Sequence, residues 1–143
     1  LVGGGSRTEN QDFVSFGRGL GVNVQVLSNL DSTEMTILMK RSTAVIGLAH
    51  GEAFGLTPIE SMALGAPPVF VDEGGYRDTI VDGVNGRLVA RGDFDDWRKA
   101  LIQARDPDTR ARWAESGLSR IVELGLSSEN YASQLDERLR SLL

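Results

Sequence analysis

The chain has 143 residues, a formal net charge of −5 and no cysteine. This length suits one ordinary domain, and the lack of cysteine excludes a disulfide framework, a cysteine zinc site and thiol catalysis. The charge is modest and spread along the chain, without a stripe of lysine and arginine, so we expect no nucleic-acid partner. No apolar run approaches the roughly 20 residues that span a bilayer, so we expect no transmembrane segment and a cytoplasmic location.

The first half of the chain alternates short apolar runs with helical patterns. In chain order, it predicts the end of a strand at 1–2, a helix at 8–18, a strand at 22–27, a second helix and a buried strand at 43–48. The second helix follows Asp31 or Ser32 as its cap, and its inward face includes Met35, Leu38 and Met39. A helix at 58–64 follows, and Gly65 and the Pro67-Pro68 pair are expected to end it.

The second half continues the alternation. It predicts a strand at 69–71, a tight loop at Gly74-Gly75, a short helix at 76–80 and a strand at 87–89 after two turn pairs. From Asp93 to Leu143 the pattern is helical, with breaks at Asp106-Pro107 and around 125–128.

Strands alternating with helices indicate an α/β fold, a Rossmann-like parallel sheet flanked by helices. Such sheets bind their ligands at the carboxyl ends of the strands, where loops lead into helices. We interpret residues 1–143 as a single domain that is truncated at its amino end, because the chain opens within a strand.

The most informative stretch is GEAFGLTPIESMALG, residues 51–65. Thr57 is a good helix N-cap, Pro58 suits the first helical position, and Glu60 completes a T-x-x-E capping box. Free backbone N–H groups and the helix dipole at such an end favour an anion, and Gly55 lets a ligand approach the backbone.

Two carboxylates, Glu52 and Glu60, flank this anion-binding turn. A carboxylate would repel a diphosphate, so each is expected to bind something else, and a vicinal diol is its natural partner. A diphosphate between two diol-bearing groups describes a nucleoside diphosphate sugar.

The runs EAFGLTPIESMALGAP and GGYRDTIVDGVNGRLV resemble the signature region of glycosyltransferase family 4. The resemblance covers essentially the whole chain and implies the carboxyl-terminal half of a GT-B enzyme, retaining and metal-independent, without a cofactor. It implies that Glu52 is the catalytic-site residue at the donor sugar and that Glu60 binds the ribose. Backbone groups of Phe54, Gly55, Leu56 and Thr57 would hold the sugar and the diphosphate.

Other candidates for the donor site are weaker. His50 either touches the transferring group or supports the loop, Gly3 and Gly4 either line the donor cleft or form a turn, and Gly75 lies close to the ligand or makes a plain turn. The acceptor would be bound by an amino-terminal domain upstream of Leu1, so we expect this chain alone to have little or no transferase activity. Peripheral membrane association of the full protein stays open.

Two rival functions stay open, and the first of them keeps the same fold. A GT-B nucleotide-sugar epimerase uses a similar cleft, but the paired glutamates are not expected there. A non-catalytic nucleotide-binding module is the other, including a dinucleotide-binding domain, although Gly3-Gly4-Gly5-Ser6 lacks the spaced G-x-G-x-x-G pattern of such a site.

Overall fold

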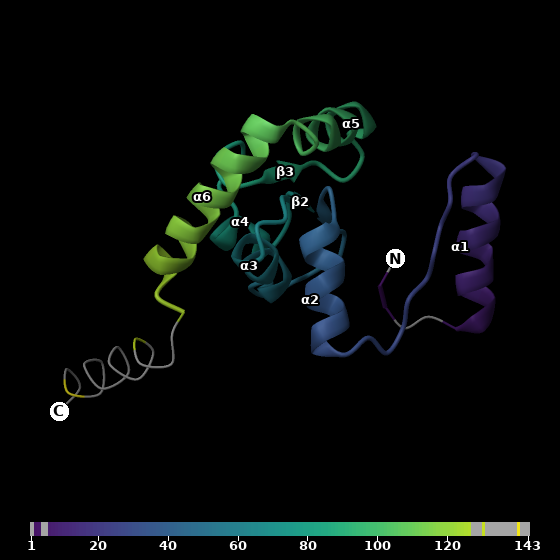
Figure 1. Ribbon diagram of the computed structural model, residues 1–143, viewed down its shortest axis with the longest axis horizontal. Coiled ribbons are helices and arrows are strands. Elements are labelled where there is room, and N and C mark those ends of the chain that lie inside the picture. Colours follow the sequence, from purple (N-terminus) through teal and green to yellow (C-terminus); the bar gives the residue numbers. More distant parts are fainter. Residues whose placement is uncertain (1, 4–5, 127–129, 131–139, 141–143) are drawn as a thin grey trace. The chain divides into compact units, whose positions relative to one another are not determined.

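The computed structural model describes residues 2–3, 6–126, 130 and 140, and Figure 1 shows its helices and strands. Contacts divide the chain into two compact units, Leu1–Ile37 and Leu38–Leu143. We describe each unit by itself, and the expectation of a single domain over 1–143 stays a prediction.

The first unit holds helix α1, Arg7–Gly19. Ser6 and Glu9 form a reciprocal capping box, in which the Glu9 amide donates to Ser6 Oγ at 3.2 Å and the Ser6 amide donates to Glu9 Oε2 at 2.8 Å. The predicted helix is confirmed within one residue at each end.

The strand predicted at 22–27 is wrong in this unit. Only Leu27 pairs, in a single parallel bridge with Val2, and the Gly3 amide donates to the Leu27 carbonyl at 3.2 Å. An apolar, β-branched run becomes a strand only when a neighbour pairs along it, and among the described residues no longer ladder forms here.

Helix α2, Ser32–Arg41, begins in the first unit and ends in the second. Asp31 caps it, because its Oδ1 accepts from the amides of Thr33 and Glu34 at 2.8 Å each. Met39 is buried, and Met35 and Leu38 are half-buried, so the predicted cap and inward face are confirmed.

The second unit contains a parallel sheet in the order β1-β2-β3. The strands are β1 Val45–Gly47, β2 Pro68–Val71 and β3 Arg87–Val89. All four residues of the central strand are buried, and the strands predicted at 69–71 and 87–89 are confirmed. The strand predicted at 43–48 is shorter and is not buried throughout, because β1 lies at the edge of this sheet and Ile46 is 48% exposed.

Helices connect and follow these strands, and Figure 1 shows them around the sheet of the second unit. They are α3 Leu56–Ala63, α4 Tyr76–Thr79, α5 Phe94–Gln103 and α6 Pro107–Leu124. Asp93 and Asp106 cap α5 and α6 through the amides of Asp96 and Thr109. The helical prediction beyond Leu126 lies outside the described residues, apart from Asn130 and Arg140.

In the part of the chain that the structure describes, the core consists of two apolar clusters. One contains Met62, Phe70, Val71, Tyr76 and Ile80, and the other contains Val69, Val89, Ala100, Ala104 and Trp113. Both include residues of β2, so the central strand anchors the core. Loops 48–55, 72–75 and 90–93 leave the carboxyl ends of the three strands at this sheet's same edge, where parallel sheets bind ligands.

Candidate functional site

Loops 48–55 and 72–75 are in direct backbone contact. The Gly75 amide donates to the Glu52 carbonyl at 2.8 Å. A Cβ on Gly74 would lie 2.6 Å from the Glu52 carbonyl oxygen, and one on Gly75 would lie 2.3 Å from the Ala53 carbonyl oxygen. The glycine pair is therefore required by close packing against the loop that carries Glu52.

Gly55 turns this loop into α3. It has a φ of +80° and is buried, and a Cβ there would lie 2.7 Å from the ring of Tyr76. We expected Gly55 to open the backbone to a ligand, but that side of its Cα faces Tyr76. Glycine is needed at this position for the left-handed conformation and for the contact with the ring.

The predicted capping box at Thr57 and Glu60 is wrong. Helix α3 begins at Leu56 with Gly55 as its N-cap, and in the part of the chain that the structure describes no side chain caps it. Thr57 is thus the second helical residue and Pro58 the third, because the Gly55 turn starts the helix two residues early. Among the described residues, no side-chain cap occupies the start of α3, which leaves its first amides available to an anion.

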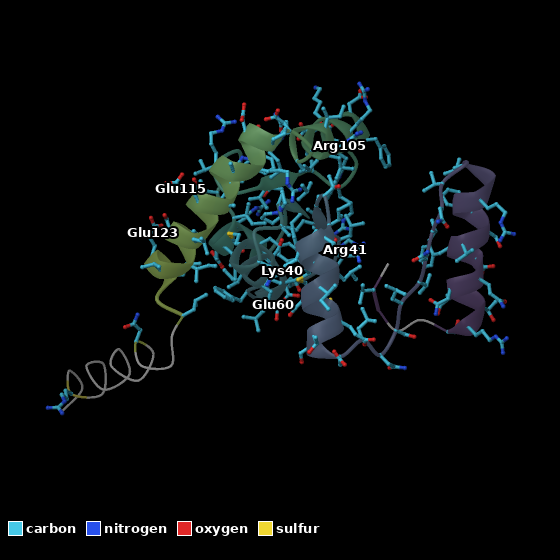
Figure 2. All side chains as sticks on the ribbon, viewed as in Figure 1. Lys40, Arg41, Glu60, Arg105, Glu115 and Glu123 are labelled. Atoms are coloured by element: carbon cyan, nitrogen blue, oxygen red, sulfur yellow. The ribbon has the colours of Figure 1, made fainter. Side chains whose placement is uncertain are left out.

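The residues of loop 48–55 and α3 that were predicted to bind the donor lie on consecutive stretches of backbone. Glu52 and Phe54 are half-buried, whereas Leu56, Thr57 and Glu60 are exposed. Figure 2 labels Glu60 on α3. Gly75 uses its amide on the Glu52 carbonyl, so in this structure it supports the loop. Gly3 lies in the first unit, and Gly4 lies outside the described residues.

Tyr76 connects the site to the core. Its ring packs edge-on against Phe70, with centroids 4.9 Å apart, and is buried. Burial raises the pKa of the Tyr76 hydroxyl, and the nearby negative charge of Glu52 raises it further.

Two charged residues that the sequence analysis did not select, Glu73 and Arg91, form an ion pair at this edge. Arg91 Nε and Nη2 donate to Glu73 Oε1 and Oε2 at 2.9 and 2.7 Å, and His50 Nδ1 lies 3.3 Å from Glu73 Oε2. The hydrogen bond from Arg91 lowers the pKa of Glu73, even though partial burial opposes this. The available signal was an acidic residue after one strand and a basic residue after the next.

The site thus offers an uncapped helix N-terminus, a half-buried carboxylate before it and an exposed carboxylate one turn into the helix. Such a set can bind an anion through the backbone and hydroxyl groups through the carboxylates. Within the described part of the chain, no group of three or more His, Cys, Asp or Glu side chains is arranged to hold a metal ion. No helix there is long and apolar enough to cross a membrane.

Residues 1–120 match the protein family described as "Glycosyl transferases group 1". The match covers well over half of the chain, so the chain belongs to this family of glycosyltransferases. Its parallel sheet with flanking helices is the fold of the carboxyl-terminal half of GT-B glycosyltransferases, as predicted.

Individual relatives support this assignment. D-inositol 3-phosphate glycosyltransferase from Frankia alni is 34% identical over 134 residues, covering 90% of this chain and 33% of that protein. Anabaena Alr3699/HepE, solved in complex with UDP-glucose, has a TM-score of 0.77 at 23% identity over 99% of this chain and 40% of that one.

A structure of a separate carboxyl-terminal domain is also similar. The C-terminal domain of the glycosyl transferase group 1 protein LpcC from Francisella tularensis has a TM-score of 0.67 at 22% identity, over 82% of this chain and 62% of that one. The chain spans about a third of the length of its Frankia relative.

Proposed function

We propose that this chain is the donor-binding part of a retaining glycosyltransferase of family 4, which transfers a sugar from a nucleoside diphosphate sugar to an acceptor. The observation that carries the proposal is the uncapped start of α3, reached through the turn at Gly55 and preceded by Glu52. The membership in a glycosyltransferase family and the UDP-glucose bound by the Anabaena protein of similar fold support it.

The roles follow from the chemistry of each group. The amides of Leu56 and Thr57 and the dipole of α3 receive the diphosphate. Glu52 accepts hydrogen bonds from hydroxyls of the donor sugar, and Glu60 accepts them from the ribose. Phe54 and His50 border the sugar on the same loop.

The reaction passes through an oxocarbenium-like transition state while negative charge develops on the leaving diphosphate. Fixed amide donors at that position lower the barrier electrostatically, because they need no reorganisation. We propose that this occurs without a metal ion, and that the acceptor is bound by a domain outside these 143 residues.

The proposal is tested by substituting Glu60 and measuring nucleotide binding by calorimetry with UDP, GDP and ADP. Loss of a hydrogen bond to a charged group weakens binding by about 10- to 100-fold, so we expect Glu60→Ala to raise the dissociation constant of the bound nucleotide by that factor. Glu115→Ala is the matched control, since Glu115 is an exposed glutamate on α6, labelled with Glu60 in Figure 2. An unchanged dissociation constant in Glu60→Ala would remove the ribose-binding role.

A further inference from the structure

Arg91, in the loop after β3, bonds to both of the other loops at the carboxyl edge of the sheet. Its Nε and Nη2 bind the two carboxylate oxygens of Glu73 in loop 72–75. Its Nη1 donates to the Leu48 carbonyl at 2.9 Å, and Nη2 lies 3.5 Å from the Ala49 carbonyl. One guanidinium therefore connects three loops that are far apart in the sequence.

Both loops that Arg91 binds also contact one another. Glu73 directly precedes Gly74-Gly75, and the Gly75 amide holds the Glu52 carbonyl. The contacts form a closed ring from Arg91 to Leu48, along the chain to Glu52, across to Gly75, back to Glu73 and to Arg91. Within this ring His50 makes a further contact with Glu73 at 3.3 Å.

The Arg91–Glu73 pair differs from a common surface ion pair. The side chains of Arg91 and Glu73 are 33% and 36% exposed, and the guanidinium also binds a backbone carbonyl. Arg77 provides the contrast, because it pairs with the same loop but both of its acceptors, Oδ1 and the carbonyl, belong to Asp72. Both of these hydrogen bonds therefore lie outside loop 48–55.

A planar guanidinium with several donors in fixed directions restrains its acceptors more than a lysine does. Fixing a loop in its binding conformation before the ligand arrives reduces the entropy lost on binding. We propose that Arg91, acting with Glu73, is a positioning residue that holds Glu52 and His50 where the donor sugar binds. The sugar part of this inference rests on the proposed function, whereas the ordering of loop 48–55 does not.

Hydrogen–deuterium exchange of the free protein tests the ordering. We expect Arg91→Ala to speed exchange in residues 49–55 and at the Gly75 amide by about tenfold or more, because the loop opens locally without global unfolding. Arg77→Ala is the matched control and should leave those amides unchanged. The same amides should exchange nearly as fast in Arg91→Lys as in Arg91→Ala, because an ammonium cannot reproduce the fixed donor directions of the guanidinium. Exchange like that of the wild type in Arg91→Ala or Arg91→Lys would overturn the inference.

Binding of UDP and UDP-glucose, compared by calorimetry, tests the link to the sugar. We expect Arg91→Ala to bind UDP as the wild type does but to lose the additional affinity for UDP-glucose. The dissociation constant of UDP divided by that of UDP-glucose should therefore fall to about one. An unchanged ratio would overturn the positioning role. If the wild type binds neither these nucleotides nor GDP and ADP, the proposed function fails, and the exchange data still decide whether Arg91 orders the loop.

Discussion

At the scale of single residues, the site depends on glycines at positions where a side chain would not fit. Gly75 adopts ordinary right-handed backbone angles, with φ of −67° and ψ of −6°, so its conformation alone does not require glycine. The requirement comes from the Ala53 carbonyl oxygen and the Phe54 Cα, which a Cβ would approach to 2.3 and 2.4 Å. Both obstacles are backbone atoms, which cannot rotate away as a side chain would.

Gly75→Ala therefore tests the packing of the two loops by steric bulk alone. We expect it to lower the free energy of unfolding by about 1–3 kcal/mol, the usual cost of overpacking, and to weaken the binding of UDP-glucose by displacing loop 48–55. Urea unfolding and calorimetry measure both effects. Gly92→Ala is the control, because open space surrounds a Cβ there and its φ is not positive. Equal stability of the two variants would refute the close-packing argument.

The ion pair at the site makes a second prediction at this scale. Since the folded-state pKa of Glu73 is lowered, chiefly by the hydrogen bond from Arg91, its pairing stabilises the fold above the ordinary carboxyl pKa of 4.5 and is lost as the pH falls through the lower folded value. We expect the stability difference between the wild type and Glu73→Gln to shrink on acidification over that window. Urea unfolding at a series of pH values measures it, and a difference that does not change with pH would contradict the assignment.

At the scale of elements, several helices and strands could be predicted from local signals. The strand at 69–71 lies between Pro68 and an Asp-Glu-Gly-Gly loop, and α6 has both a Pro at its start and Gly125 in the left-handed conformation after it. These signals come from neighbours in the chain, so the sequence alone was sufficient.

The errors at this scale arose from contacts between distant residues. The start of α3 depends on the packing of Gly55 against Tyr76, and a local capping pattern at Thr57 cannot reveal this contact. The strand at 22–27 failed because an apolar run does not specify a partner strand. The motif placed Glu52 and His50 on one loop ahead of a helix, but the Glu73–Arg91 pair required knowing which side chains meet at the sheet edge.

The capping of α6 gives a prediction for a whole element. The side-chain and backbone hydrogen bonds with Thr109 lower the pKa of Asp106, so its charged cap stabilises α6 above the ordinary pKa of 3.8 and is lost as the pH falls through the folded value. Asp106→Asn keeps a capping group but does not titrate. We expect the difference in free energy of unfolding between the wild type and this variant, measured by urea unfolding, to be constant near neutral pH and to decrease below 3.8. A variant whose stability falls with acid in the same way as that of the wild type would contradict this.

At the scale of the whole molecule, nucleotide binding and sugar transfer are separable. Since the acceptor is proposed to bind outside these 143 residues, we expect this chain to bind a nucleoside diphosphate but to show little or no transferase turnover. A turnover assay with a donor sugar, run beside an enzyme that contains both halves, measures this. Comparable rates would show that these residues contain the acceptor site as well.

The central claim is that the start of α3 binds the diphosphate of a nucleotide. Its most direct test is a titration of the ¹⁵N-labelled protein with UDP, GDP, ADP and NAD, followed by NMR of the backbone amides. The account predicts that a nucleoside diphosphate causes its largest shifts at Gly55, Leu56 and Thr57, with smaller shifts at Glu52 and Glu60. Shifts concentrated on another part of the chain, or no shift with any of the four ligands, would contradict it.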